Sequence, residues 1–344
     1  MNRKFSLLTT IIFHLNNYHL LLLSFLKIQH MKLVTAFFRM IRLPNLFFIA
    51  LTQFLFQYCI LVPLFKKNGV DPVFSNWLLL LLVFSSVLIA AAGYIINDYF
   101  DINIDQVNKP QKNVVDNLIS RRWAMLWHSF LSFAGVVLGF YIGWMLNVFW
   151  IGLMNFFCSL LLFVYSAIFK KRLLSGNLII SVLTAWSVTI LGLATFYIVF
   201  YNTASYSAIE NNKILRFTIL YSAFAFILSM IREAIKDMED MPGDSKYGCR
   251  TMPIVWGINA TKIYTAVWLT VLISALLILQ IYLLQYKWWW PVVYGFVAIT
   301  LVLILILKNL FKAKKPEEFH RLSNLAKFTM LTGILSMIIF RFYL

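Results

Sequence analysis

The chain has 344 residues, of which 61% are hydrophobic and 12% charged, whereas a soluble domain carries about 25% charged residues. Apolar runs of about 20 residues recur along it, long enough to cross a bilayer and too continuous for barrel strands, so a soluble globular protein and a β-barrel are both excluded. The net charge of +17 does not indicate nucleic-acid binding, because the basic residues lie in short segments beside the apolar runs and face anionic lipid. The predicted fold class is all-α, a polytopic membrane protein.

Residues 1–30 differ from the rest of the chain. Their apolar stretch is interrupted by polar residues such as His14 and Asn17, and no small-residue cleavage site of a signal peptide stands out. Met31 then opens the segment MKLVTAFFRMIRLPNLFFIA, in which basic residues precede a helix, as at a natural beginning. We expect residues 1–30 to be a dispensable N-terminal extension and residues 31–344 to form a single intramembrane domain.

Nine membrane-spanning helices follow in chain order. They are predicted at residues 43–64, 77–97, 123–145, 148–168, 178–200, 214–235, 261–284, 289–307 and 324–343. Basic residues gather in the segments after the second, fourth, sixth and eighth spans, with Lys66 and Lys67 the main exception. Because such segments stay in the cytoplasm, the pattern predicts a multi-pass protein of the inner (cytoplasmic) cell membrane, with its N-terminus and these four segments on the cytoplasmic side.

Two acidic stretches interrupt this apolar chain. The second span runs into NDYFDINIDQ at residues 97–106, which contains Asp98, Asp101 and Asp105. The sixth span runs into REAIKDMEDMPGDSKYGCR at residues 232–250, with Glu233, Asp237, Glu239, Asp240 and Asp244. The two stretches hold eight of the 13 acidic residues, and both are predicted as loops on the same side of the membrane.

The spacing of these acids favours a metal site. On a helix, the three acids of the first stretch share one face, and so do Asp237, Asp240 and Asp244 of the second. Clustered carboxylates repel one another unless cations lie between them. Acids beside helix ends often only cap the helix, but two triplets at helical spacing favour binding. Oxygen ligands without Cys or His favour Mg²⁺ over zinc, and Mg²⁺ completes its shell with phosphate oxygens and water.

Basic residues lie among the acids, namely Lys109, Arg232, Lys236, Lys246 and Arg250. Such a mixture suits a diphosphate, because a metal binds some of its oxygens and Lys or Arg binds the others. The residues therefore predict a Mg²⁺–diphosphate site at a membrane surface, and a lipid-tailed diphosphate fits the apolar helices beside it. The spans carry almost no acids, which argues against an ion-coupled transporter.

These motifs resemble those of the UbiA superfamily of intramembrane prenyltransferases. Residues 97–105, NDYFDINID, match the first family motif, NDxxDxxxD, and are followed by NKP at 108–110. Residues 240–244, DMPGD, match the second motif, DxxxD, while RLPN at 42–45 and YSAIFKKRLLSGN at 165–177 are further similarities. The resemblance covers residues 35–343 and implies nine transmembrane helices around a central cavity, the number of spans counted above.

The resemblance also implies roles for individual residues. The expected catalytic residues, grouped around two Mg²⁺ ions and the substrate diphosphate, are Asn97, Asp98, Asp101, Asp105, Asp237, Asp240 and Asp244. The expected metal ligands among them are Asn97, Asp98, Asp101, Asp105, Asp240 and Asp244. The expected substrate-binding residues are Asn45, Arg42, Lys109, Tyr165, Lys170, Arg232, Lys236 and Lys246. The basic ones would neutralise the diphosphate, and Asn45 and Tyr165 would line the cavity near the reacting carbon.

The implied reaction is Mg²⁺-dependent transfer of a polyprenyl group from an isoprenoid diphosphate to a hydrophobic or amphiphilic acceptor. Metal and basic residues stabilise the departing diphosphate, and the site excludes water that would quench the allylic cation. The stretch INDYFDINIDQVNKP is most similar to the digeranylgeranylglyceryl phosphate synthase-like branch, which favours geranylgeranylglyceryl phosphate as the acceptor.

Other readings of the sequence remain open. The acceptor could be an aromatic quinone precursor of the menaquinone or ubiquinone type, or the reaction could modify haem or chlorophyll side chains. A non-enzymatic carrier or transporter of polyprenyl phosphate is a further alternative. The expected partners are an isoprenoid diphosphate, a lipid or aromatic acceptor and the lipid bilayer, with no nucleic acid and with the active site facing the cytoplasm.

Overall fold

A computed structural model describes residues 34–108, 119–202, 206 and 209–344. Within these residues, nine helical stretches are long and apolar enough to cross a membrane. The elements are α2 (Leu43–Leu55), η1 (Phe56–Leu61), α3 (Val62–Lys66), α4 (Asn76–Asn108), α5 (Arg121–Met145), α6 (Trp150–Ala167), η2 (Phe169–Lys171), α7 (Ser175–Tyr201), α9 (Asn211–Lys246), α10 (Met252–Val255), α11 (Ile258–Gln285), α12 (Trp289–Tyr294), η3 (Gly295–Thr300), α13 (Leu301–Leu310) and α14 (Pro316–Phe340). The prediction of an all-α protein with nine spans is confirmed, whereas the expectation for residues 1–30 lies outside the described residues.

Two spans are not regular α-helices throughout. The first consists of α2, η1 and α3, and the eighth consists of α12, η3 and α13, where η1 and η3 are π-helical. Pro63 lies in the first turn of α3, just after η1, and its missing N–H removes one backbone hydrogen bond there. The buried Gln57 of η1 donates through Nε2 to the Phe74 carbonyl oxygen at 3.1 Å. This contact ties the irregular stretch to the segment that precedes α4.

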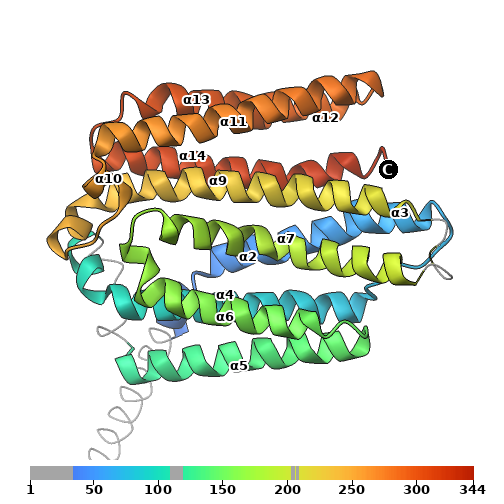
Figure 1. Cartoon of the computed structure of the whole chain (residues 1–344), viewed down its shortest axis with the longest axis horizontal. Helices are drawn as coiled ribbons and strands as arrows, with labels where there is room; N and C mark the ends of the chain where they lie inside the picture. The colour runs from blue at the N-terminus through green and yellow to red at the C-terminus, as the bar shows by residue number, and fades with distance from the viewer. Residues whose placement is uncertain (1–33, 109–118, 203–205, 207–208) are drawn as a thin grey trace, which may run out of the picture.

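The helices form one bundle (Figure 1). In this view α5 lies at one edge and α11 and α13 lie at the other, with α7, α9 and α14 between them. The most extensive contacts join α4 to α5 and α7 to α9. Glycines allow these close approaches, since a side chain at Gly135 would meet Ile89 and one at Gly192 would meet Thr218.

Buried apolar side chains support the acidic ends of both long helices. Ile95 and Ile102 of α4 pack in one cluster with Met40, immediately beside the first motif. Met238 of α9 belongs to a second cluster with Phe319 of α14, beside the second motif. The carboxylates of both motifs are therefore carried on helices that are held by packing on either side of them.

The helices α4 and α9 extend well beyond their predicted spans. The spans were expected to end near residues 97 and 235, with acidic loops behind them, but α4 continues to Asn108 and α9 to Lys246. Both motifs are thus helical, which places acids three and four residues apart on one face. Figure 1 shows the ends of α4 and α9 with α10 and the α6–α7 turn at the left end of the bundle, and the C-terminus at the other end.

Candidate functional site

Asp101 of α4 is the most deeply buried acid among the described residues, with 1% of its surface exposed. Its Oδ2 accepts a hydrogen bond from Asn97 Nδ2 at 2.8 Å, one helical turn away, and forms an ion pair with Lys170. Its Oδ1 is also buried and accepts no hydrogen bond from any described residue. Asp101 therefore keeps one oxygen available for a further ligand.

Lys170 reaches Asp101 from a segment that is distant in sequence. It lies in η2, the short turn between α6 and α7, and 34% of its side chain stays exposed. Burial would lower the pKa of Lys170, but the Asp101 carboxylate outweighs this effect and holds the pKa above its ordinary value. The lysine is thus protonated and neutralises the charge of Asp101.

Arg42 neutralises Asp98 in a similar way. Its Nη2 donates to Asp98 Oδ1 at 2.7 Å, and its guanidinium lies 5.2 Å from the centroid of the Tyr94 ring. Burial lowers the pKa of Arg42, but the nearby Asp98 and Tyr94 outweigh this effect and hold the pKa above its ordinary value. Arg42 has a left-handed backbone with φ of 52° at the start of α2, and this sharp turn separates α2 from the helical residues 34–40.

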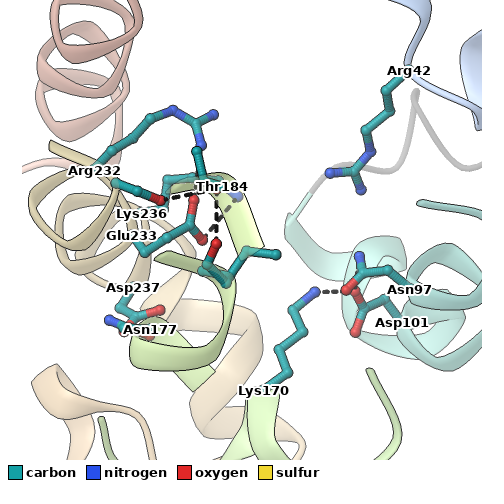
Figure 2. Close-up of polar contacts among 12 residues, drawn as sticks. Arg42, Asn97, Asp101, Lys170, Asn177, Thr184, Arg232, Glu233, Lys236 and Asp237 are labelled. Atoms are coloured by element: carbon teal, nitrogen blue, oxygen red, sulfur yellow. Dashed lines mark hydrogen bonds and ion pairs between the residues drawn. The ribbon is translucent and has the colours of Figure 1, made fainter. Parts of the chain in front are cut away.

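The acidic stretch of α9 carries counter-charges of its own, just before the second motif. Glu233 accepts a hydrogen bond from Arg232 Nη1 at 2.8 Å and lies 3.9 Å from Lys236 Nζ. Asp237 accepts a hydrogen bond from Asn177 Nδ2 of α7 at 2.9 Å. Figure 2 shows this group on one side and Asn97 and Asp101 on the other, with the Lys170 side chain directed at the latter. The acidic stretch of α9 and the first motif on α4 therefore face each other across the end of the bundle.

Hydrogen bonds between the Asn108 side chain and the backbone of α9 connect the two motifs. Asn108, the last residue of α4, donates through Nδ2 to the Asp240 carbonyl oxygen at 3.0 Å and accepts from the Gly243 N–H at 2.8 Å. A side chain at Gly243 would overlap the Asn108 amide, so this position requires glycine for the close approach. The Arg250 N–H also donates to the Lys171 carbonyl oxygen at 2.8 Å. The turn that carries Lys170 is thereby attached to the segment after α9.

The other predicted residues fall into three groups. Tyr165 of α6 is buried, and Lys170, Glu233, Asp101 and Asp237 lie within electrostatic range of its hydroxyl. Three acids, Asp105, Asp240 and Asp244, are half-buried and each has an interaction partner. Lys246 is exposed at the end of α9, without an ion pair to any described residue, and Lys109 lies outside the described residues. The structure thus brings most of the predicted side chains to one place.

The oxygen ligands of the site suit a magnesium ion that the substrate helps to hold. Over residues 34–108, 119–202, 206 and 209–344, no three His, Cys, Asp or Glu side chains converge closely enough to hold a metal ion by themselves. The carboxylate oxygens are nevertheless the ligands that Mg²⁺ prefers, and Mg²⁺ commonly takes only one or two carboxylates together with substrate phosphates. The buried, unpartnered Oδ1 of Asp101 fits this use. The residues present are compatible with Mg²⁺ held jointly with a diphosphate, and the assignment of individual ligands stays a prediction.

Three residues of the site, Glu233, Asn177 and Lys327, were not predicted as site residues from the sequence. Glu233 is a central acceptor for two basic residues, and Asn177 holds Asp237. Lys327 of α14 donates to Asn45 Oδ1 at 2.8 Å. A lysine inside an apolar span was the available signal for Lys327, and its partner on α2 could not be identified without the fold.

The chain is similar to known proteins in both sequence and fold. The sequence pattern of the UbiA prenyltransferase family matches residues 45–330. The digeranylgeranylglyceryl phosphate synthase of Methanosphaera stadtmanae is 28% identical over 247 residues, which cover 71% of this chain and 81% of that protein. A solved structure concerning digeranylgeranylglyceryl phosphate synthase in membranes has a TM-score of 0.60 at 23% identity and covers 91% of this chain and 100% of that one.

A second solved structure shows the same fold with ligands. It is a UbiA homologue of Archaeoglobus fulgidus bound to DMAPP and Mg²⁺, with a TM-score of 0.50 and 15% identity, covering 88% of this chain and 98% of that one. The family match spans most of the described chain and includes both acidic motifs. The chain therefore belongs to the UbiA prenyltransferase family, and it is a multi-pass membrane enzyme that transfers prenyl groups.

Proposed function

We propose that this prenyltransferase moves a geranylgeranyl-type chain from its diphosphate to the free hydroxyl of geranylgeranylglyceryl phosphate. The observation that carries the proposal is the meeting of carboxylates and cations from two distant motifs, centred on Asp101 and its buried free oxygen. The names of the curated relatives support the acceptor. The Archaeoglobus homologue with DMAPP and Mg²⁺ supports the donor class and the metal.

Two Mg²⁺ ions, held with the donor diphosphate by the carboxylates of both motifs, would supply charge neutralisation for the leaving group. Asn97, Asp98, Asp101 and Asp105 of α4 would be the metal ligands on one side, and Asp240 and Asp244 of α9 would be those on the other. Lys170 and Lys236, together with Lys109 and Lys246, would contact the remaining oxygens as point charges. Lys170 would then exchange Asp101 for a phosphate oxygen when the donor binds.

The reaction breaks one bond and forms one. The allylic C–O bond of the donor breaks, and its electron pair leaves with the diphosphate, which the basic residues stabilise as charge develops. An oxygen lone pair of the acceptor hydroxyl forms the new C–O bond, and the hydroxyl proton leaves with the diphosphate. Tyr165 and the apolar side chains around it would keep water from the allylic carbon.

The active-site end of the bundle is proposed to face the cytoplasm of the cell's inner membrane. The supporting pattern is the excess of Lys and Arg in the four segments at that end. Single cysteines at Ser120 and Ser245 should react with an impermeant thiol reagent from one side, and a cysteine at Tyr343 from the other. Reaction of the two motif ends from opposite sides would contradict the arrangement.

The proposed function is tested by product analysis. Membranes containing the protein should receive geranylgeranyl diphosphate and a panel of acceptors, comprising geranylgeranylglyceryl phosphate, hydroxybenzoate and dihydroxynaphthoate, with lipid products identified by mass spectrometry. We expect the diether phosphate and release of diphosphate, and both should form far more slowly with the Asp101→Asn variant. Prenylated aromatic products would instead assign a quinone precursor, and unchanged geranylgeranyl diphosphate would favour a carrier.

A further inference from the structure

Lys327 is a charged residue within an apolar membrane-spanning helix. It lies on α14, 11 residues after Pro316, which is roughly 17 Å along the helix. It is the sole charged residue between Arg321 and the end of α14. An ionisable group at such a depth is unfavourable unless a partner or a function retains it.

The contacts of Lys327 leave its charge without a carboxylate. Its Nζ donates to Asn45 Oδ1 at 2.8 Å and lies 5.4 Å from the centroid of the Phe48 ring. None of the acids in the described part of the chain forms an ion pair with it. An ammonium group has three N–H donors, and the hydrogen bond to Asn45 uses one of them. Donors therefore remain for a ligand.

Two arginines bring their charge to the same place. The guanidinium groups of Arg232 and Arg42 act electrostatically on Lys327. Arg232 lies on α9, which packs against α14, and Arg42 directly precedes α2, which also packs against α14. Arg232 Nε is buried and finds no acceptor among the described residues. Arg42 is paired with Asp98 and Arg232 with Glu233, so Lys327 is the cation of the three that no described carboxylate neutralises, and Arg232 Nε is a further unused donor.

Such an arrangement suits an anion that binds without a metal. The donor diphosphate is expected among the motif carboxylates, where metal ions can bridge it, and Lys327 has no carboxylate partner for a metal. A phosphate monoester carries close to two negative charges at neutral pH and accepts hydrogen bonds from Lys and from both nitrogens of an Arg fork. We propose that Lys327, together with Arg232 and Arg42, forms a second anion site that binds the phosphate head of the acceptor.

This inference rests on the proposed function and adds a residue that determines specificity. Two substrates that each carry phosphate need separate sites, since otherwise either could occupy both positions. Lys327 would hold the acceptor from α14 beside Asn45, while Lys170 and the motif carboxylates hold the donor from the other side. Arg42 and Arg232 would lie between the two anions, with Arg42 bound to Asp98 and Arg232 bound to Glu233.

The test measures the KM of both substrates in Lys327→Gln, Lys327→Arg and the control Lys312→Met, which removes an exposed lysine from the same end of the bundle. Loss of a charge-assisted hydrogen bond should raise the acceptor KM of Lys327→Gln about ten- to hundredfold. The donor KM and the rate at saturating acceptor should change little, Lys327→Arg should recover most of the loss, and Lys312→Met should match the wild type. Geranylgeranylglycerol, which lacks the phosphate, should be used equally by wild type and Lys327→Gln.

The possible outcomes separate the two proposals. An unchanged acceptor KM in folded Lys327→Gln, or an effect confined to the donor KM, overturns the second anion site and leaves the proposed function intact. An equal loss with geranylgeranylglycerol shows that the phosphate is not the group recognised and overturns the site as well. A wild-type enzyme that uses aromatic acceptors and no glyceryl phosphate overturns both.

Discussion

The acidic stretches of α4 and α9 differ in the origin of the cations that neutralise them. On α4, Asp98 and Asp101 are paired with Arg42 and Lys170, which lie 56 and 69 residues away in the sequence. On α9, Glu233 is paired with Arg232 and Lys236 of the same helix. The first pairing depends on the tertiary fold, and the second is present wherever α9 is helical.

This difference indicates that the motifs respond differently to substrate. A cation held by a separate segment, such as Lys170 in the η2 turn, can be transferred from carboxylate to phosphate by a small movement of that segment. The cations of α9 are fixed relative to their acid by helix geometry. The first motif is therefore the one expected to rearrange when the donor and metal bind.

Removal of the metal should have the largest effect. With EDTA, turnover should fall to background, because the diphosphate would leave without charge neutralisation. Added Mg²⁺ or Mn²⁺ should restore it. Diphosphate release at the normal rate in EDTA would rule out a metal-dependent first motif.

Loss of one carboxylate from either motif should come next. Asp101→Asn and Asp240→Asn should each lose about 10²–10³ in rate, since each removes a strong electrostatic contribution in a site that excludes water. The double variant should lose less than the product of the two, because the carboxylates act as one unit. Single-turnover diphosphate release measures this, and Asp71→Asn, remote from both motifs, serves as the control.

Lys170 and Lys236 should differ from each other. Lys170→Met leaves Asp101 buried without a cation. The free energy of unfolding should therefore fall by about 1–3 kcal/mol, and the variant should unfold at a lower temperature. Lys236→Met should change less, because Glu233 keeps Arg232. Thermal unfolding with and without Mg²⁺ is the measurement. Magnesium should stabilise Lys170→Met more than wild type, and equal responses would contradict the transfer of Asp101 from lysine to metal.

Removal of the hydrogen bonds between Asn108 and α9 should have the smallest effect. Asn108→Ala removes two hydrogen bonds to α9, which should reduce the free energy of unfolding by about 1–3 kcal/mol and slow turnover by about tenfold through misplacement of the motifs. The control is Asn103→Ala, the same change at an exposed position of α4. If both variants behave alike in denaturation and turnover assays, the Asn108 bridge does not position the motifs.

The sequence was sufficient for the fold class and for the acids of the site, because apolar length and helical spacing are local properties. It placed the ends of α4 and α9 too early, since hydropathy falls at the first carboxylates although the helices continue. Cations neutralise the acids there, and they come from other segments at α4 and from the same helix at Glu233 of α9. The pairing of Lys170 with Asp101 and of Lys327 with Asn45 depends on helix packing, for which no local pattern exists.

Arg42 shows that the best residue for the backbone is not always the best for the site. Its left-handed conformation, with φ of 52°, costs about 1–2 kcal/mol for a residue with a side chain. A glycine would relieve this strain and would also remove the guanidinium that holds Asp98. Losing that charge-assisted hydrogen bond costs about as much as the strain that glycine would relieve, so a selection for heat resistance alone would have little reason to replace Arg42.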